Sequence, residues 1–254
     1  QYFRFYDDRI AEGITMSGQL VIRDTAKALD AYMNKVCGTD DEMYSFYSDT
    51  DSCYVTCKKM VDNFFPDKDT DKVVGLLDRI ATDKIEPAIA QAMTKLGNYT
   101  NAFEHKIDFK REVIADKGVF VAKKRYALNV LDDEGLRLKE PKLKVMGLEI
   151  VRSSTPGPIR ESLKEAVRLI LTSDEEHLQK FIEQAKADFK TRTPEDIAFP
   201  RGCNNLVKYQ SNADIYQKGT PIHVRGSLLY NHMLEKQNLK LKYEKIQDGD
   251  KIKF

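Results

Sequence analysis

Apolar residues recur at close to the 3.6-residue period of an amphipathic helix in two long stretches of the first part of the chain. The first stretch predicts a helix from Ile10 to Val36, with Gly38 following as a stop signal. The second predicts a helix from about Lys72 to Leu96. Pro87 should kink or break this second helix, because proline lacks the amide hydrogen that the helix ladder needs.

Strand patterns lie between these helices and after them. Two short apolar, β-prone runs, residues 43–47 and 53–57, flank an acidic segment and predict a hairpin. Two further strands are predicted downstream, at residues 102–114 and 118–131, with a turn at residues 132–135.

The second part of the chain begins with two amphipathic helices, predicted over residues 158–171 and 174–189. Ser173–Glu176 supplies a capping residue and acidic side chains for the first turn of the second of them. The last 60 or so residues look like short β-prone pieces joined by loops, and residues 249–254 look like a strand. The whole pattern predicts an α+β protein.

Composition describes an ordinary soluble protein, with 41% hydrophobic and 32% charged residues among 254. No apolar run approaches the roughly 20 residues of a membrane span, and no secretory leader is visible. The four cysteines show no metal-type spacing, and Cys53 and Cys57 fall on one face of a strand, so we expect reduced thiols and a cytoplasmic protein.

Charge is unevenly distributed along the chain. Residues 1–103 hold 12 lysines and arginines and 17 aspartates and glutamates, whereas residues 104–254 hold 29 and 23. An acidic first part and a basic second part suit a protein that collects cations at one end and binds phosphates along the other.

The segment Tyr47–Ser52, with the sequence YSDTDS, combines turn-forming and metal-binding residues. Aspartate, serine and threonine favour turns because their side chains hydrogen-bond to nearby backbone groups. Asp49 and Asp51 are two residues apart, so in an extended segment both carboxylates would project to one side, where a hard divalent cation can bind. The alternative is a solvated acidic turn that holds no metal.

These six residues resemble the YxDTDS motif of family B DNA polymerases. Downstream, Ala122–Leu128 (AKKRYAL) resembles the KKRY element with which these enzymes hold the primer-template. Three further segments resemble the stretch after the fingers motif, the passage from palm to thumb, and a thumb segment of the tailed-phage, T-even-like branch: residues 2–19, 144–156 and 221–226. The matches occur in the family's order and cover most of the chain.

The resemblance implies an antiparallel-sheet polymerase palm with packing helices over residues 1–152. A mainly helical thumb with small β elements, incomplete at its C-terminal end, would follow over residues 153–254. In the family, the exonuclease domain, the first palm motif with its metal-binding aspartate and the fingers all precede the point where this sequence starts. We therefore expect a fragment, or one polypeptide of a split polymerase, that needs the missing part for activity.

The family uses two Mg²⁺ ions for nucleotidyl transfer, held by carboxylates because Mg²⁺ prefers hard oxygen ligands. The resemblance assigns the main ligand role to Asp51 and a supporting role to Asp49. Glu112 lies where family members often carry a further acidic residue facing the metals. Two residues earlier the family often has an aspartate, whereas this sequence has Lys110. The alternative is that Glu112 is an ordinary glutamate on a surface strand.

The basic residues suit binding of duplex backbone rather than base sequence. If the KKRY segment is one strand, Lys124 and Tyr126 face one side, and Lys123 and Arg125 face the other. The alternative is a strand edge protected by positive charge. Further DNA contacts are expected at Ser52, Lys142, Lys144, Arg152, Ser153, Ser154, Thr155, His223 and Arg225, although a lone histidine such as His223 is more often a packed residue.

The sequence thus predicts part of a DNA-directed DNA polymerase acting in the cytoplasm of an infected bacterial host. Its partners would be primer-template DNA, dNTP and the upstream exonuclease, palm and fingers polypeptide, with a sliding clamp as a further candidate and no membrane. The alternative is a non-catalytic duplex-DNA-binding protein derived from a polymerase. Retention of both Asp49 and Asp51 favours the enzyme, because carboxylates beside phosphates do not help a pure binder.

Overall fold

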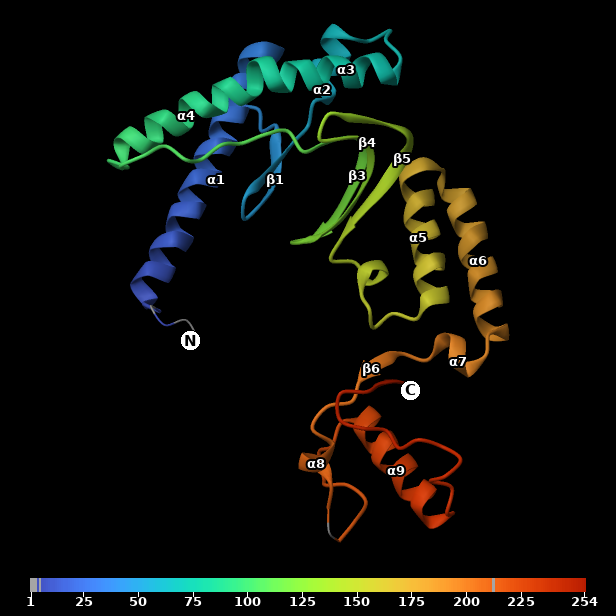
Figure 1. The fold of residues 1–254 in the computed structure, drawn as a ribbon. Helices are drawn as coiled ribbons and strands as arrows, with labels where there is room; N and C mark the ends of the chain where they lie inside the picture. The colour runs from blue at the N-terminus through green and yellow to red at the C-terminus, as the bar shows by residue number, and fades with distance from the viewer. Residues whose placement is uncertain (1–3, 5, 212) are drawn as a thin grey trace. The chain divides into compact units, whose positions relative to one another are not determined.

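The computed structural model describes residues 4, 6–211 and 213–254 (Figure 1). They group into two compact units, unit 1 with residues 1–124 and 128–144, and unit 2 with residues 125–127 and 145–254. Helices and small antiparallel sheets make up the fold, which confirms the predicted α+β class. Within the described ranges, no helix is long and apolar enough to cross a membrane. Tyr2, Phe3 and Phe5 of the predicted opening segment lie outside the described residues.

Unit 1 begins with α1 (Asp8–Cys37), which confirms the first predicted helix. The Asp7 side chain caps its first turn, and Gly38 ends it in the left-handed conformation with a φ of 66°. The buried side chains of α1 recur every four residues in its second half: Thr25, Leu29, Met33 and Cys37. The first half buries none, and its exposed side chains include large apolar ones: Ile10, Ile14 and Met16.

The second predicted helix contains one turn of a different helical type in the structure. α3 (Thr70–Ile80) and α4 (Glu86–Tyr99) are joined by a π-helical turn, η1 (Ala81–Ile85). Pro87 lies just after this π-helical turn, and because it has no amide hydrogen it cannot donate to a carbonyl of the preceding turn. The expected break at Pro87 does not occur, because helical residues run without a gap from residue 70 to residue 99, with one π-helical turn just before the proline. A short helix, α2 (Lys58–Phe64), was not predicted because seven residues carry too little periodicity.

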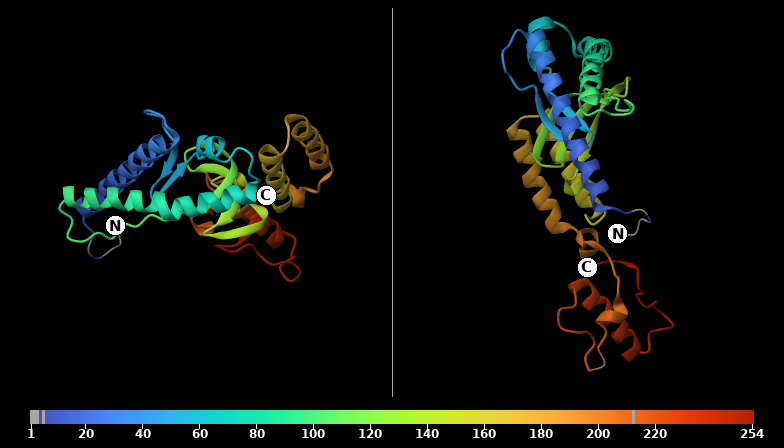
Figure 2. Two further views of the ribbon diagram at one scale, coloured as in Figure 1. Left: turned by 90° about the horizontal axis from the view of Figure 1, so that it is seen from above. Right: turned by 90° about the vertical axis from the view of Figure 1, so that its left-hand side faces the viewer.

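α4 packs against α1, and the two helices lie side by side in Figure 2. Their contact forms one core cluster, made of Leu29 from α1 and of Ile89, Met93 and Leu96 from α4. Cys53 and Val55 of the β1–β2 hairpin pack against the same cluster. The hairpin therefore rests on the helix pair.

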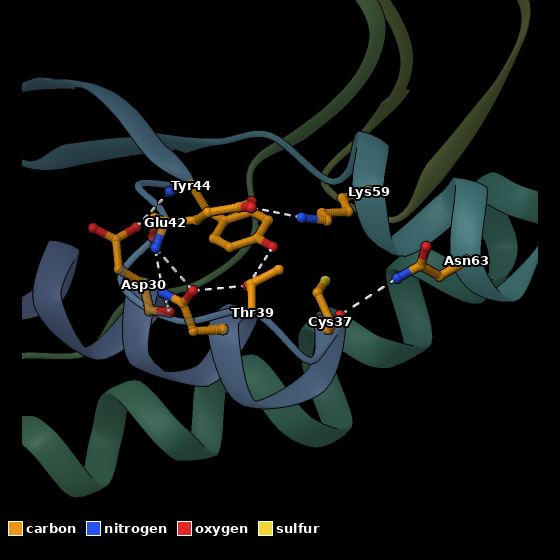
Figure 3. A network of polar contacts seen from close by, with 8 residues as sticks. Asp30, Cys37, Thr39, Glu42, Tyr44, Lys59 and Asn63 are labelled. Atoms are coloured by element: carbon orange, nitrogen blue, oxygen red, sulfur yellow. Dashed lines mark hydrogen bonds and ion pairs between the residues drawn. The ribbon is translucent and has the colours of Figure 1, made fainter.

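Asp30 of α1 fixes the start of the first strand of that hairpin, β1 (Ser45–Asp49). Its Oδ1 accepts hydrogen bonds from the amides of Tyr44 and Ser45, at 2.9 and 2.7 Å, and its Oδ2 accepts one from the Ser45 hydroxyl at 2.9 Å. The Tyr44 ring is buried, and its hydroxyl lies 2.9 Å from Thr39 Oγ1 (Figure 3). The base of the hairpin is thus bound to the last turns of α1.

Replacing Asp30 with alanine is expected to lower the free energy of unfolding by about 2–3 kcal/mol, because it leaves two strand amides without their charged acceptor. Urea unfolding followed by circular dichroism measures this loss. Asp30→Asn keeps one acceptor oxygen and should recover part of it. Glu12→Ala, on the exposed first half of α1, is the control. An Asp30→Ala effect no larger than that of the control would contradict the anchoring role.

A three-stranded sheet of order β3-β4-β5 completes unit 1. Its strands are β3 (Val113–Ala122), β4 (Arg125–Asp133) and β5 (Leu136–Met146). The strand predicted over residues 102–114 is wrong, because no strand precedes Val113 there. The strand predicted over 118–131 is two strands, which meet at a turn formed by Lys123 and Lys124. The turn predicted at residues 132–135 is confirmed, with Gly135 at a φ of 85°.

Arg111 joins this sheet to the helices. Its guanidinium pairs with Asp132 of β4, at 2.5 Å, and with Asp78 of α3. Its backbone amide donates to Glu86 at the start of α4, at 2.9 Å. Burial alone would lower the pKa of Arg111, but the carboxylates of Asp78 and Asp132 outweigh it, and the pKa lies above its ordinary value.

Unit 2 contains both predicted helices of the second part, α5 (Gly157–Thr172) and α6 (Glu175–Thr191). The predicted cap is confirmed at Asp174, whose side chain accepts a hydrogen bond from the His177 amide at 2.9 Å. The two helices pack side by side (Figure 2). Shorter helical elements accompany them: η2 (Glu149–Val151), α7 (Pro194–Ile197) and α8 (Leu206–Tyr209).

The end of the chain is more helical than predicted. Strands β6 (Pro200–Gly202) and β7 (Lys251–Lys253) pair antiparallel, so the strand expected in residues 249–254 is confirmed. Between them lies α9 (Ile222–Lys236), where only β-prone pieces and loops were expected. Pro221 and the β-branched residues of the first turn weaken its sequence signal. The helix forms because its apolar side packs into a core cluster of Cys203, Leu206, Val224 and Leu228.

Candidate metal and nucleic-acid site

The acidic motif lies at the tip of the hairpin made by β1 and β2 (Ser52–Val55). Asp49 and Ser52 are the last paired residues, and Thr50 and Asp51 form the turn between them. Thr50 has a φ of 46°, in the left-handed region that a two-residue hairpin turn requires. The Asp51 amide and the Ser52 hydroxyl donate to the Asp49 carbonyl, at 2.5 and 3.2 Å.

The turn brings the two aspartates together in a different way from the extended segment that was predicted. Because Thr50 is left-handed, Asp49 and Asp51 do not sit on one extended segment as the alternation argument assumed. Asp49 ends β1 with its side chain 24% exposed, while Asp51 is exposed in the turn. Both carboxylates are therefore at the tip, one partly enclosed and one open to solvent.

The basic turn between β3 and β4 contacts this tip. Lys124 Nζ lies 3.2 Å from Asp49 Oδ1, and the Lys124 amide donates to the Tyr47 hydroxyl at 2.7 Å. Below this contact, the Phe120 ring of β3 packs against Tyr47 and Tyr54, with centroids 4.9 and 5.4 Å apart. Two motifs more than seventy residues apart in sequence are thus joined by packing, a hydrogen bond and an ion pair.

The predicted alternation of the basic segment is wrong. Lys123 and Lys124 form the turn rather than a strand, and both are exposed. Tyr126 is buried in β4 with 6% of its surface exposed, so it does not share an open face with Lys124. Of this basic segment, Lys124 is the residue whose charge the described contacts bring to the acidic tip.

The oxygen donors of Asp49 and Asp51 fit a hard cation such as Mg²⁺. Among the described residues, however, no group of three or more histidine, cysteine, aspartate or glutamate side chains could hold a metal. The described part of the tip thus offers two carboxylates, and Mg²⁺ can be bound by one or two carboxylates because it keeps several water ligands.

Glu112 is not brought to this tip. It precedes β3, and the whole length of that strand separates it from the turn that contacts Asp49. Its Oε1 lies 2.5 Å from Lys144 Nζ. The described structure therefore places Glu112 in a surface ion pair.

Arg125 and Arg152 of unit 2 converge on one carboxylate. Arg125 Nη2 lies 2.8 and 2.7 Å from the two carboxylate oxygens of Glu149, and Arg152 Nη2 lies 3.7 Å from Oε1. A hydrogen bond from its own backbone amide, with the two arginines, holds the pKa of Glu149 below its ordinary value. The side chains of these pairs are 40–55% exposed, so the pairs are weak.

The remaining residues of the predicted palm-to-thumb stretch differ in how exposed their side chains are and in whether they already have a partner. Lys142 pairs with Asp133 at 3.2 Å, and its side chain is 64% exposed. Ser153 is exposed and Ser154 is half-buried. Thr155 is buried, and its hydroxyl donates to the Glu149 carbonyl at 2.7 Å, so it holds the segment in place.

His223 and Arg225 lie in the first turn of α9, not on a strand as expected. The His223 ring lies 5.5 Å from that of Phe254. Arg225 Nε donates to the Thr220 carbonyl at 2.7 Å, and its guanidinium lies over the Tyr216 ring. Both side chains thus have local packing roles.

Sequence reasoning missed the residues that hold the site together. Tyr47 was recognised only as a letter of the motif, although it binds the basic turn. Asp30 and Arg111 carry no motif at all. The one usable signal was the tyrosine itself, since a phenol at the end of a strand can both pack and accept a hydrogen bond.

Comparison with known proteins agrees with the motifs. The family model described as divergent family B DNA polymerase matches residues 43–185. The chain is 38% identical over 244 residues to the DNA-directed DNA polymerase of Escherichia phage RB69, which covers 92% of this chain and 27% of that protein. It is 37% identical over 261 residues to the DNA-directed DNA polymerase of Enterobacteria phage T4, which covers 99% of this chain and 28% of that protein.

The chain thus spans little more than a quarter of the length of either relative. The matched family region contains the hairpin, the basic turn and the first helices of unit 2. The chain belongs to the divergent family B DNA polymerases.

Proposed function

We propose that this chain forms the C-terminal palm and the thumb of a template-directed DNA polymerase, with the boundary near residue 152. The observation that carries the proposal is the contact between Lys124 and Asp49, because it brings the acidic tip and the basic turn into one site. The polymerases of the two phage relatives are much longer. Activity would therefore need the exonuclease, first palm and fingers sections.

Asp51 would be the main ligand of Mg²⁺ and Asp49 a supporting one. Bound Mg²⁺ supplies stabilisation of the charge that develops on the attacked phosphate and the leaving group. Asp51 is free to turn toward a cation because it is exposed in the turn. Asp49 is partly enclosed and already balanced by the Lys124 ammonium, which suits an orienting role.

Primer-template DNA would be held through its backbone by exposed or half-buried basic and hydroxyl side chains. A polymerase has to move over every sequence that it copies, so contacts to phosphates serve it better than contacts to base edges. The proposed contact residues are Ser52, Lys123, Lys124, Arg125, Lys142, Lys144, Arg152, Ser153 and Ser154. Tyr126 and Thr155 would support them from within, and His223 and Arg225 are the weakest members of the set.

Lys124→Ala is expected to reduce the slope of log affinity against log salt by about one unit and to weaken two unrelated duplexes equally. The reason is that each lysine bound to a phosphate releases condensed counterions whatever the base sequence. Fluorescence anisotropy with the 254-residue chain, at several salt concentrations, measures the slope.

Lys35→Ala is the matched control, since Lys35 is exposed near the C-terminal end of α1, beside the base of the hairpin and not at its tip. This variant should keep the wild-type slope. An unchanged slope in Lys124→Ala, or a strong preference for one duplex, would refute DNA binding by the basic turn.

A further inference from the structure

The position of Lys124 depends on its backbone. Lys124 has a φ of 60°, in the left-handed region that side chains with a Cβ atom adopt reluctantly. Its ammonium reaches Asp49 only from the tip of the β3–β4 turn, where the chain reverses. A contact from outside the turn would offset this cost.

Tyr47 provides that interaction. Its hydroxyl accepts a hydrogen bond from the Lys124 amide, at 2.7 Å. The turn is thus tied to β1, the strand that ends in Asp49. Tyr47 of β1 thus binds the backbone of Lys124, and Asp49 of the same strand pairs with its ammonium.

The Tyr47 ring is itself held by aromatic neighbours. It lies 5.4 Å from Tyr54, its partner on β2, and 4.9 Å from Phe120 of β3. Because Phe120 precedes the turn by only a few residues, the packing and the hydrogen bond act on the same segment. Removing the hydroxyl alone would leave the packing in place.

We propose that Tyr47 is a positioning residue that holds the β3–β4 turn on the acidic hairpin, so that Lys124 stays within reach of both Asp49 and a DNA phosphate. With its amide fixed, the flexible stem of Lys124 lets the ammonium move between the carboxylate and the phosphate. The DNA part of this inference rests on the proposed function, whereas the contact between the two turns does not.

Amide hydrogen exchange tests the contact without DNA. In Tyr47→Phe, the Lys124 amide should exchange about tenfold faster or more, as measured by NMR of the labelled 254-residue chain. Tyr54→Phe is the matched control, because it removes a phenolic oxygen from the same aromatic cluster but not the one that meets Lys124. An unchanged Lys124 exchange rate in Tyr47→Phe would overturn the inference.

A double-mutant cycle tests the consequence for DNA. Tyr47→Phe should weaken duplex binding about threefold in the wild-type background and not at all in the Lys124→Ala background, since the two residues act through one contact. Its thermal midpoint should stay near that of the wild type, because the ring remains. Equal weakening in both backgrounds would show a general structural role and overturn the inference.

The two arms separate the inference from the proposed function. If the wild-type chain shows no salt-dependent duplex binding, the proposed function fails. The exchange experiment then still decides whether Tyr47 positions the turn.

Discussion

Replacing Asp51 with alanine is expected to abolish primer extension in the complete polymerase while leaving duplex affinity nearly unchanged. A carboxylate lost from a metal site removes stabilisation of the charged transition state, and we expect a fall in rate of about a thousandfold or more. The duplex would still be held, because the basic turn does not depend on Asp51 for its position. Rapid-quench extension assays and anisotropy titrations measure the two quantities separately.

Asp49→Ala is the informative comparison. It should slow extension less than Asp51→Ala does, and it should not weaken duplex binding, because it frees the Lys124 ammonium from its ion pair. The enzyme for these assays is this chain combined with an upstream exonuclease, palm and fingers polypeptide, and the 254-residue chain alone, which is expected to show no extension, is the control. A larger loss from Asp49→Ala than from Asp51→Ala would reverse the assigned roles.

The same assay distinguishes the enzyme from a non-catalytic DNA-binding protein. A pure binder would restore no extension when combined with the upstream polypeptide, and neither aspartate variant would then change any rate. Extension that disappears in Asp51→Ala would exclude that alternative.

Arg111→Leu is expected to lower the free energy of unfolding by about 3–5 kcal/mol, because it leaves a buried carboxylate without its cation. The Asp132 side chain is only 5% exposed, and that of Arg111 only 13%. The arginine also joins α3 to the sheet through Asp78. Urea unfolding of the chain measures the loss.

Arg111→Leu combined with Asp132→Asn is the control for this mechanism. Asparagine keeps an oxygen that can accept the Gly135 amide, as Asp132 Oδ1 does at 3.0 Å, but it carries no charge. The double variant should therefore recover part of the lost stability. A double variant less stable than Arg111→Leu alone would show that the unpaired charge is not the cause.

The long helices were predictable because their patterns and their ends agree. α1 and α6 each combine an apolar period with a stop or capping residue, Gly38 and Asp174, and α5 has an apolar period with a proline in its first turn. Local chemistry and tertiary packing point to the same structure in these elements. Their bounds therefore differ from the predicted ones by only a few residues.

The errors arose where tertiary packing overrides local preference. β4 is buried from Tyr126 to Asp132 and so shows no alternation, and no glycine or asparagine marks the turn at Lys123 and Lys124. α9 was missed because its core contacts come from residues distant in the sequence. Propensity is a weak guide in both cases.

The candidate site was predictable in its motifs but not in its connections. Asp49, Asp51 and the two lysines follow from the resemblance to family B polymerases. The contact of Lys124 with Tyr47 and Asp49 does not, since it depends on how a strand turn folds over a hairpin. Glu112 is the opposite case. The resemblance placed it beside the metals, but in the structure the length of β3 separates it from the turn that contacts the tip.

The first half of α1 is expected to make the state of the isolated chain in solution depend on its concentration. Ile10, Ile14 and Met16 are 60%, 69% and 59% exposed on a helix end that buries no side chain among the described residues. Exposed apolar groups gathered on one segment favour association with whatever apolar surface is nearest. As the concentration rises, that surface becomes another copy of the chain. Dilute and concentrated solutions will then contain different species, and light scattering will report a mass that increases with concentration.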